Sequence, residues 1–147
     1  MKVSFERRKS NAFQPISAAA LSEMQSVLSE TYLYVDETAL QSHGHDETED
    51  LVFLPEAVAE PANTAEISAL MKICYKNRIP VTIRGGGSGL AGGALPIHGG
   101  LIISMKRLDR IIQIDERNFQ VTVEPGVITE HLQNTLKEMG LFYPPDP

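Results

Sequence analysis

The chain has 147 residues, 42% of them hydrophobic and 22% charged, and a formal net charge of −6. This length predicts one domain with a buried core, and the composition is that of an ordinary soluble globular protein. Six of the 19 acids lie between Asp36 and Asp50, where there is no lysine or arginine, so the rest of the chain is close to neutral. The charge therefore argues against a nucleic-acid partner or an anionic membrane surface.

The first 50 residues contain one clear pattern. After an irregular stretch, helical spacing of Leu21, Met24 and Leu28 predicts a helix over residues 17–30. The next segment, "YLYV", reads either as a strand or as the packed end of that helix. Residues 36–50 are expected to form a polar, acidic loop whose charges face solvent.

A strand–helix–strand unit follows, with strands at 57–60 and 81–84 and a helix over 63–77. Asn63 and Glu66 fit a capping box at the start of the helix. Such a unit favours parallel strands with a right-handed crossover. One apolar face of the helix is formed by Ile67, Leu70, Met71 and Cys74. Cys74 is the only cysteine, which excludes an internal disulfide, and we expect its thiol to be buried.

The last third of the chain is predicted to add a buried strand, a hairpin and a helix. "LIISM" (101–105) reads as the buried strand, and residues 111–115 and 119–124 as the hairpin. One face of the hairpin is expected to be buried, since Val121 and Val123 alternate with polar residues. The helix begins near Thr129 and ends at Gly140, with an apolar face of Leu132, Leu136 and Met139.

Eight of the chain's 11 glycines lie between Gly85 and Gly100, directly after the strand at 81–84. A flexible loop is one interpretation, but this concentration favours a backbone cradle for a phosphate or diphosphate. Gly87–Gly92 matches the G-x-G-x-x-G pattern, yet no helical periodicity follows before Leu101, so a Rossmann site is rejected. A Walker loop also fails, since no Lys-Ser or Lys-Thr follows a glycine in this stretch.

Histidines offer weaker signals. His43 and His45 stand near acids, and two histidines with a carboxylate are a metal-binding set. Their loose spacing in a polar segment favours a solvated loop instead. His98, just beyond the glycine stretch, is expected at the surface. No run approaches the roughly 18 apolar residues of a membrane span, and no signal-peptide pattern appears, so a cytoplasmic protein without a transmembrane segment is expected.

Several motifs in order carry a family resemblance: "RGGGSGLAGGALP" (84–96), a strand, "KRLDRI", a hairpin, "VEPGV" and "YPPDP". From about residue 35 onward the chain resembles the FAD-binding PCMH-type, or vanillyl-alcohol oxidase-like, domain. Within that family it is most similar to the group of the glycolate oxidase D-subunit and D-lactate dehydrogenase, which are FAD-linked oxidases of 2-hydroxy acids.

The resemblance implies an α+β fold, in which a small parallel α/β layer packs on a larger antiparallel sheet with FAD between them. Residues 1–34 would be an N-terminal helical extension. Residues 35–147 would be the N-terminal part of the domain, because full-length relatives continue into a second glycine-rich stretch and a substrate cap. The unpaired sheet edges this leaves suggest a dimer formed through them.

The resemblance also implies roles for residues. Arg84 would either contact the cofactor or form a salt-bridged strand end. Pro61 and the Pro125–Gly126 pair would lie near the adenosine half, and Pro145 and Asp146 near the flavin side. The FAD should be non-covalent, since no histidine or cysteine lies between Arg84 and Pro96. The diphosphate would be bound by Gly85, Gly86, Gly87, Ser88, Gly89 and Leu90.

In function, the resemblance implies the FAD-binding portion of a dehydrogenase or oxidase acting on a small 2-hydroxy acid such as glycolate or D-lactate, with a possible electron-acceptor subunit. The catalytic and metal-binding residues of that group lie beyond this chain, so the 147 residues alone should be inactive and bind FAD weakly or not at all. Two alternatives remain: a non-catalytic phosphate-binding or assembly module, and another chemistry within the same family.

Overall fold

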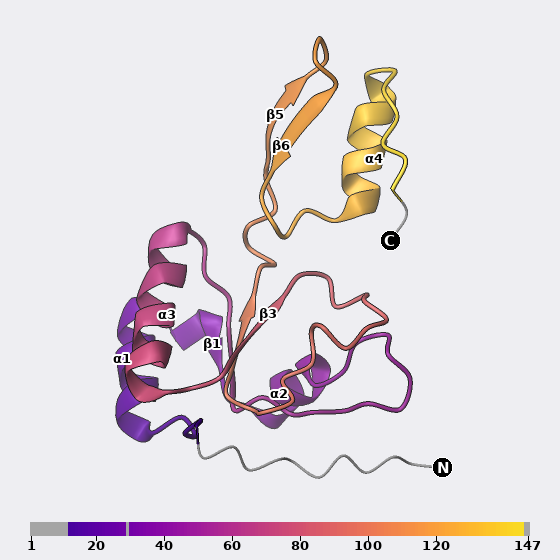
Figure 1. Ribbon diagram of the computed structural model, residues 1–147. Helices are drawn as coiled ribbons and strands as arrows, with labels where there is room; N and C mark the ends of the chain where they lie inside the picture. Colours follow the sequence, from indigo (N-terminus) through magenta and orange to yellow (C-terminus); the bar gives the residue numbers. More distant parts are fainter. Residues whose placement is uncertain (1–11, 29, 146–147) are drawn as a thin grey trace.

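The structure, a computed structural model, describes residues 12–28 and 30–145. Figure 1 shows a body formed by the first two thirds of the chain, from which a hairpin and the last helix project together. The elements in chain order are α1 (Ala18–Val27), η1 (Glu30–Tyr32), β1 (Leu33–Tyr34), α2 (Glu37–His43), β2 (Ala57–Ala59), α3 (Thr64–Asn77), β3 (Val81–Arg84), β4 (Leu101–Ser104), β5 (Ile111–Asp115), β6 (Gln120–Val123) and α4 (Thr129–Glu138).

The body is built on a four-stranded sheet with the order β1-β2-β4-β3. β4 lies between β2 and β3 and is parallel to both, whereas β1 pairs with β2 in the antiparallel direction. The predicted strand–helix–strand unit with parallel strands is therefore confirmed. The segment "YLYV" contains β1, an edge strand of this sheet, because Leu33 pairs with Ala59 and Tyr34 with Val58.

The core lies around β4. Leu101, Ile102 and Ile103 are fully buried, as expected for a continuous apolar strand covered on both faces. α1 and α3 lie side by side along the sheet (Figure 1) and contribute Met24 and Leu70, which are also fully buried. The helix that precedes residue 35 thus shares one hydrophobic core with the parallel sheet. Whether residues 1–34 form a separate extension stays a prediction.

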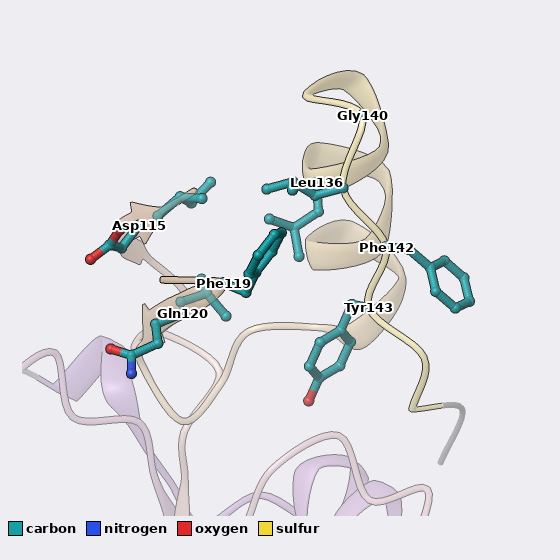
Figure 2. Close-up of a pocket in the computed structure, with 10 residues that line it drawn as sticks. Asp115, Phe119, Gln120, Leu136, Gly140, Phe142 and Tyr143 are labelled. Atoms are coloured by element: carbon teal, nitrogen blue, oxygen red, sulfur yellow. The ribbon is translucent and has the colours of Figure 1, made fainter. Parts of the chain in front are cut away.

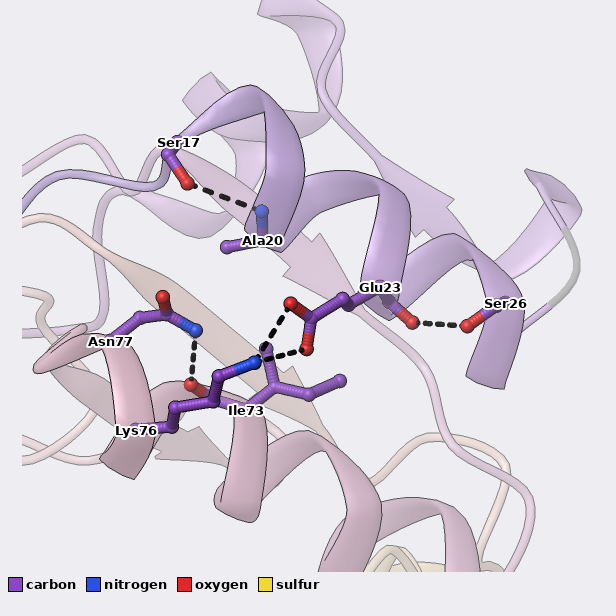
Figure 3. Close-up of polar contacts among 7 residues, drawn as sticks. All are labelled: Ser17, Ala20, Glu23, Ser26, Ile73, Lys76 and Asn77. Carbon is purple, nitrogen blue, oxygen red and sulfur yellow. Dashed lines mark hydrogen bonds and ion pairs between the residues drawn. The ribbon is translucent and has the colours of Figure 1, made fainter.

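Polar contacts close the two-helix layer at its outer side (Figure 3). Ser17 begins α1 by accepting a hydrogen bond of 3.2 Å from the Ala20 amide. Lys76 Nζ of α3 lies 3.2 Å from Glu23 Oε1 of α1, but both side chains are largely exposed. Such a pair contributes at most about 1 kcal/mol, so apolar burial rather than charge stabilises the layer.

α3 begins with the predicted capping box: the Glu66 amide donates to Asn63 Oδ1 at 2.9 Å, and the Ala62 amide to Glu66 Oε2 at 2.7 Å. The predicted apolar face is partly wrong. Met71 is 43% exposed, while Ile73, which was not predicted for this face, is buried. Cys74 is buried as expected, and burial raises the pKa of its thiol to about 11.

The prediction of a loop over residues 36–50 is wrong for its first half. Asp36 caps α2, accepting a 3.0 Å hydrogen bond from the Ala39 amide, and the helix runs from Glu37 to His43. The acids that suggested a loop mark the start of this helix, because an acid is favourable both as the N-cap and in the first turn. The expectation of solvated charges also fails at Asp46, which is 7% exposed.

The hairpin of β5 and β6 is antiparallel and pairs Ile111 with Val123. The expected burial of one face is wrong for the described residues, since Val121 is half-buried and Val123 36% exposed. α4 buries Leu132 and Leu136, whereas Met139, also expected on its apolar face, is 40% exposed. Gly140 ends the helix in the left-handed region, with a φ of 75°.

Two short segments lie at the base of the hairpin: residues 105–110, between β4 and β5, and residues 124–128, between β6 and α4. Together they are called the linker here, and specific contacts fix them. The Gly126 amide donates to the Leu108 carbonyl at 2.8 Å. The Arg107 guanidinium donates to the Glu60 carbonyl at 2.9 Å and lies 3.5 Å from the centre of the Tyr32 ring. The linker is therefore attached to the first sheet through β1, β2 and their neighbours.

Candidate functional site

The glycine stretch leaves the sheet at the carboxyl end of β3. The Met105 amide donates to the Arg84 carbonyl at 2.9 Å, which is the last ladder bond before the chain turns outward. Residues 85–91 are exposed apart from the half-buried Gly87. No amide from Gly86 to Ala91 donates a hydrogen bond to another described residue. A run of free N–H groups in a glycine turn is the usual form of an anion-binding concavity.

The space around these glycines is open. A Cβ added at Gly89 would have no neighbour within 4 Å, and one at Gly86 would meet only Ser88 Oγ at 3.8 Å. Gly87 has a φ of 75°, a conformation that side chains disfavour. The loop thus presents backbone donors to open space, and no helix occurs between Gly85 and Gly100. The rejection of a Rossmann site is confirmed.

Arg84 lies behind the loop. It is 9% exposed, and its Nη1 donates to the His45 carbonyl at 2.7 Å. Its guanidinium occupies the position that a Cβ at Gly87 would need. Burial lowers the pKa of Arg84, and the nearby Asp46 charge opposes that change. Of the two roles left open for Arg84, the geometry describes a support of the loop by a buried strand end.

A cleft of about 440 Å³ opens where β3 and β4 end. Parallel strands end at the same edge of a sheet, which is the usual position of ligand sites in such folds. The cleft brings together four of the predicted residues, namely Arg84, Gly85, Gly86 and Gly126. It adds residues that were not predicted for a cofactor site: Ser42, His43, Ser104, Lys106, Asp109 and Ile128. Lys106 is the cation suited to a phosphate, and its place directly after a buried strand was the signal that could have indicated it.

The remaining predicted residues lie elsewhere. Pro61 is fully buried and does not line this cleft. Leu90 is 78% exposed at the tip of the glycine loop. The Pro145 carbonyl accepts a 2.9 Å hydrogen bond from Gln133 Nε2 of α4. Asp146 lies outside the described residues.

Three of the four histidines, His43, His45 and His98, show no common site. His43 Nδ1 lies 2.9 Å from the Ala39 carbonyl, and His45 Nδ1 lies 3.2 Å from the Gln41 carbonyl, so both rings bond to α2. No group of three metal-ligating side chains occurs in residues 12–28 and 30–145. His98 is half-buried rather than at the surface, because its ring packs 5.0 Å from that of Phe13.

A second cleft, of about 330 Å³, separates the β5–β6 hairpin from α4. Figure 2 shows Phe119 pointing across it toward Leu136, while Phe142 points away. Phe119 and Phe142 are 84% and 86% exposed. The lining is mainly apolar and contains one carboxylate, Asp115, so it carries no evident anion-binding chemistry.

Comparison with known proteins identifies the family of the chain and its cofactor. The profile of a family described as an FAD binding domain matches residues 55–147, which contain the glycine stretch, the linker and the hairpin. The chain belongs to this FAD-binding family. Its cofactor is FAD, whose diphosphate is the kind of anion that the free amides of the glycine loop suit.

Curated relatives of this FAD-binding domain are flavoenzymes. It is 44% identical over 105 residues to the glycolate oxidase subunit GlcD of Bacillus subtilis, an alignment that covers 71% of this chain and 22% of the relative. It is 35% identical over 127 residues to the probable mitochondrial D-lactate dehydrogenase of Danio rerio, covering 86% of this chain and 26% of the relative. The chain thus spans about a quarter of these proteins.

Solved structures confirm the fold class. A 4-ethylphenol oxidase from Gulosibacter chungangensis superimposes with a TM-score of 0.73 at 28% identity, covering 85% of this chain and 26% of that one. An alkyldihydroxyacetonephosphate synthase superimposes with a TM-score of 0.78 at 18% identity, covering 94% and 28%. Because one fold serves such different proteins, the fold does not identify the reaction. No helix in the described part of this FAD-binding domain is long and apolar enough to cross a membrane.

Proposed function

We propose that the glycine loop binds the diphosphate of FAD through the backbone amides of Gly85 to Leu90, with the Ser88 hydroxyl as an additional donor. The observation that carries this proposal is the run of amides from Gly86 to Ala91 without a partner in the described structure. Unsatisfied donors that face open space lose nothing when a ligand oxygen replaces water, and several of them act together on one anion.

The cleft beside the loop is proposed to hold the rest of the dinucleotide. The Lys106 ammonium would oppose the diphosphate charge at the carboxyl end of β4. Gly126 would face the adenosine half. Pro61, which is buried and does not line the cleft, would act on that half only indirectly. Pro145 and Asp146 would lie toward the flavin. With no histidine or cysteine from Arg84 to Pro96, binding would be non-covalent.

We propose that the protein to which this domain belongs oxidises a small 2-hydroxy acid of the glycolate or D-lactate type. The relatives named a glycolate oxidase subunit and a D-lactate dehydrogenase support that substrate class. When bound, FAD supplies the hydride acceptor for such an oxidation. The residues of this chain bind and orient the cofactor. An electron-accepting partner subunit is also proposed, supported by the word subunit in the name of the Bacillus relative.

The experiment is a titration of the 147-residue chain with FAD, followed by quenching of flavin fluorescence. Weak binding is expected from the chain alone, without turnover of glycolate or D-lactate. Gly87→Val should abolish this binding, because its side chain would displace the Arg84 guanidinium from behind the loop. Gly93→Ala is the matched control, since Gly93 lies beyond the proposed diphosphate loop and its Cβ would meet no neighbour within 4 Å. FAD affinity that is the same in wild type and Gly87→Val would refute the loop assignment.

A further inference from the structure

We infer that Asp46 and Thr48 are positioning residues that hold the glycine loop in its cofactor-binding geometry. They belong to His45–Thr48, here called the clasp, within the acidic segment that the sequence presents as a plain solvated loop. The inference rests on the proposed function of the glycine loop. It assigns to the clasp a task that involves no contact with FAD.

Two hydrogen bonds join the clasp to the two ends of the loop. The His45 carbonyl accepts from Arg84 Nη1 at 2.7 Å, at the strand end where the loop begins. Thr48 Oγ1 accepts from the Gly92 amide at 2.8 Å, where the loop ends. Between these points no amide from Gly86 to Ala91 has a protein partner in the described structure. The loop is therefore held at both ends by the clasp and free in the middle.

Asp46 explains how the clasp keeps its shape. It is 7% exposed, and its Oδ1 accepts from the Thr48 amide at 2.9 Å, which orders the turn that presents Thr48. Its Oδ2 is buried and has no hydrogen-bond partner among the described residues. The hydrogen bond from the Thr48 amide is therefore the contact that ties Asp46 to the turn, and the Arg84 charge only adds to the stabilisation of the ionised form. Burial disfavours the ionised Asp46, but the Thr48 hydrogen bonds and Arg84 outweigh burial and keep its pKa below the usual value.

The link from the clasp to the loop passes through Arg84. Because the guanidinium stands where a Gly87 Cβ would be, any displacement of Arg84 moves the support on which the turn at Gly87 rests. The His45 carbonyl binds that guanidinium directly, and Asp46 orders the turn that follows His45. An anion site made of backbone donors depends on their mutual orientation, and residues that restrict the loop before binding reduce the ordering cost.

The test compares single-site variants of the 147-residue chain by two readouts. The first is amide hydrogen exchange in peptides that cover residues 85–94, and the second is the dissociation constant for FAD. Thr48→Val removes the acceptor of the Gly92 amide at nearly constant shape. It should speed loop exchange and weaken FAD binding by about fivefold each, the effect of one neutral hydrogen bond. Thr48→Ser retains the acceptor and should restore both values.

Asp46→Asn keeps an acceptor for the Thr48 amide but removes the charge that faces Arg84. It should therefore change both readouts in the same direction, and it decides the question if Thr48→Val does not fold. Thr135→Val is the matched control, because its hydroxyl bonds within α4, to the His131 carbonyl at 2.9 Å. Loop exchange and FAD affinity should both equal the wild-type values in this control.

The outcomes separate this inference from the proposed function. If Thr48→Val and Asp46→Asn leave loop exchange unchanged, the clasp does not hold the loop. Faster loop exchange with unchanged FAD affinity also overturns the inference, since the clasp would then be structural only. If FAD binds the wild-type chain and Gly87→Val equally well while the exchange pattern appears as expected, the proposed cofactor site is overturned, and the positioning of the loop by the clasp is supported on its own.

Discussion

Individual glycines in this domain serve different physical needs, although the sequence presents them as one run. Gly87 needs a positive φ and a missing Cβ at once, because Arg84 packs against it. Gly89 lies in open space and needs neither in the absence of a ligand. Glycine content alone therefore indicates a site at which backbone amides bind a ligand. The contacts of each glycine show at which positions a side chain would lower the stability of the fold.

Stability should distinguish the two positions. Gly87→Ala should lower the free energy of unfolding by about 1–2 kcal/mol, the cost of a left-handed conformation for a residue with a Cβ, with some addition from the displaced Arg84. Gly89→Ala should change it by less than about 0.5 kcal/mol, as is usual for exposed sites. Urea unfolding followed by circular dichroism measures both. Equal effects of the two substitutions would contradict this account of the loop.

The Arg110–Glu124 pair gives a pH dependence at the base of the hairpin. Arg110 Nη2 lies 2.7 Å from Glu124 Oε1, and this side-chain hydrogen bond holds the pKa of Glu124 below its usual value. The stabilisation is present above the ordinary glutamate pKa of about 4.3 and is lost as the pH falls through the lowered folded value. Glu124→Gln should thus lower the thermal midpoint near neutral pH and have less effect in acid. A difference in thermal midpoint between wild type and Glu124→Gln that grows as the pH falls would contradict this stabilisation by the ionised Glu124.

At the level of the elements, local patterns predicted α3, the parallel strands and the hairpin, because apolar periodicity reports directly on a helix or strand face. They failed for α2, whose start is marked only by Asp36 and an acidic first turn. They also failed to anticipate the exposure of Val123, since alternation within a strand predicts a buried face without identifying the element that covers it. The linker contacts around Gly126 were likewise absent from any local pattern.

Gly126, the glycine of the linker, should tolerate no added side chain without a loss of stability. An added Cβ would meet the backbone carbonyls of Met105 and Leu108, which cannot move as a side chain does. Gly126→Ala should therefore cost more than about 2 kcal/mol of unfolding free energy, in the range of severe overpacking. Gly93→Ala is the control, since its Cβ would have no neighbour within 4 Å. A Gly126→Ala variant as stable as this control would show that the linker tolerates the shift.

Several large apolar side chains are exposed in the part of the molecule that projects from the body, which is the hairpin with α4 and the segment after it (Figure 1). Ile112, Phe119 and Phe142 are 60%, 84% and 86% exposed, and the hairpin edges are unpaired in the described structure. Contiguous apolar surface and free strand edges both favour association. The expected dimer through open edges remains a prediction that this surface supports.

Sedimentation over a range of concentrations measures that association. Wild type should show a rising average mass, and Ile112→Lys combined with Phe119→Ser should reduce it by placing a charge and removing an aromatic ring on the hairpin. Lys137→Ser, on the exposed side of α4, is a surface control without apolar loss. A monomer at all concentrations, or equal association in both variants, would contradict the prediction.

Spacing over a few residues was enough to predict one domain, most of its helices and strands, and a backbone cradle for a phosphate or diphosphate. The α+β fold and FAD as the ligand were implied only by the family resemblance. The support of that cradle was not predictable in this way. Arg84 meets His45 across 39 residues and Gly92 meets Thr48 across 44. Only the folded sheet, which brings the ends of β3 and β4 beside the segment after α2, places a buried carboxylate behind the glycine loop. Contacts at that separation leave no periodic signal, since nothing local requires them.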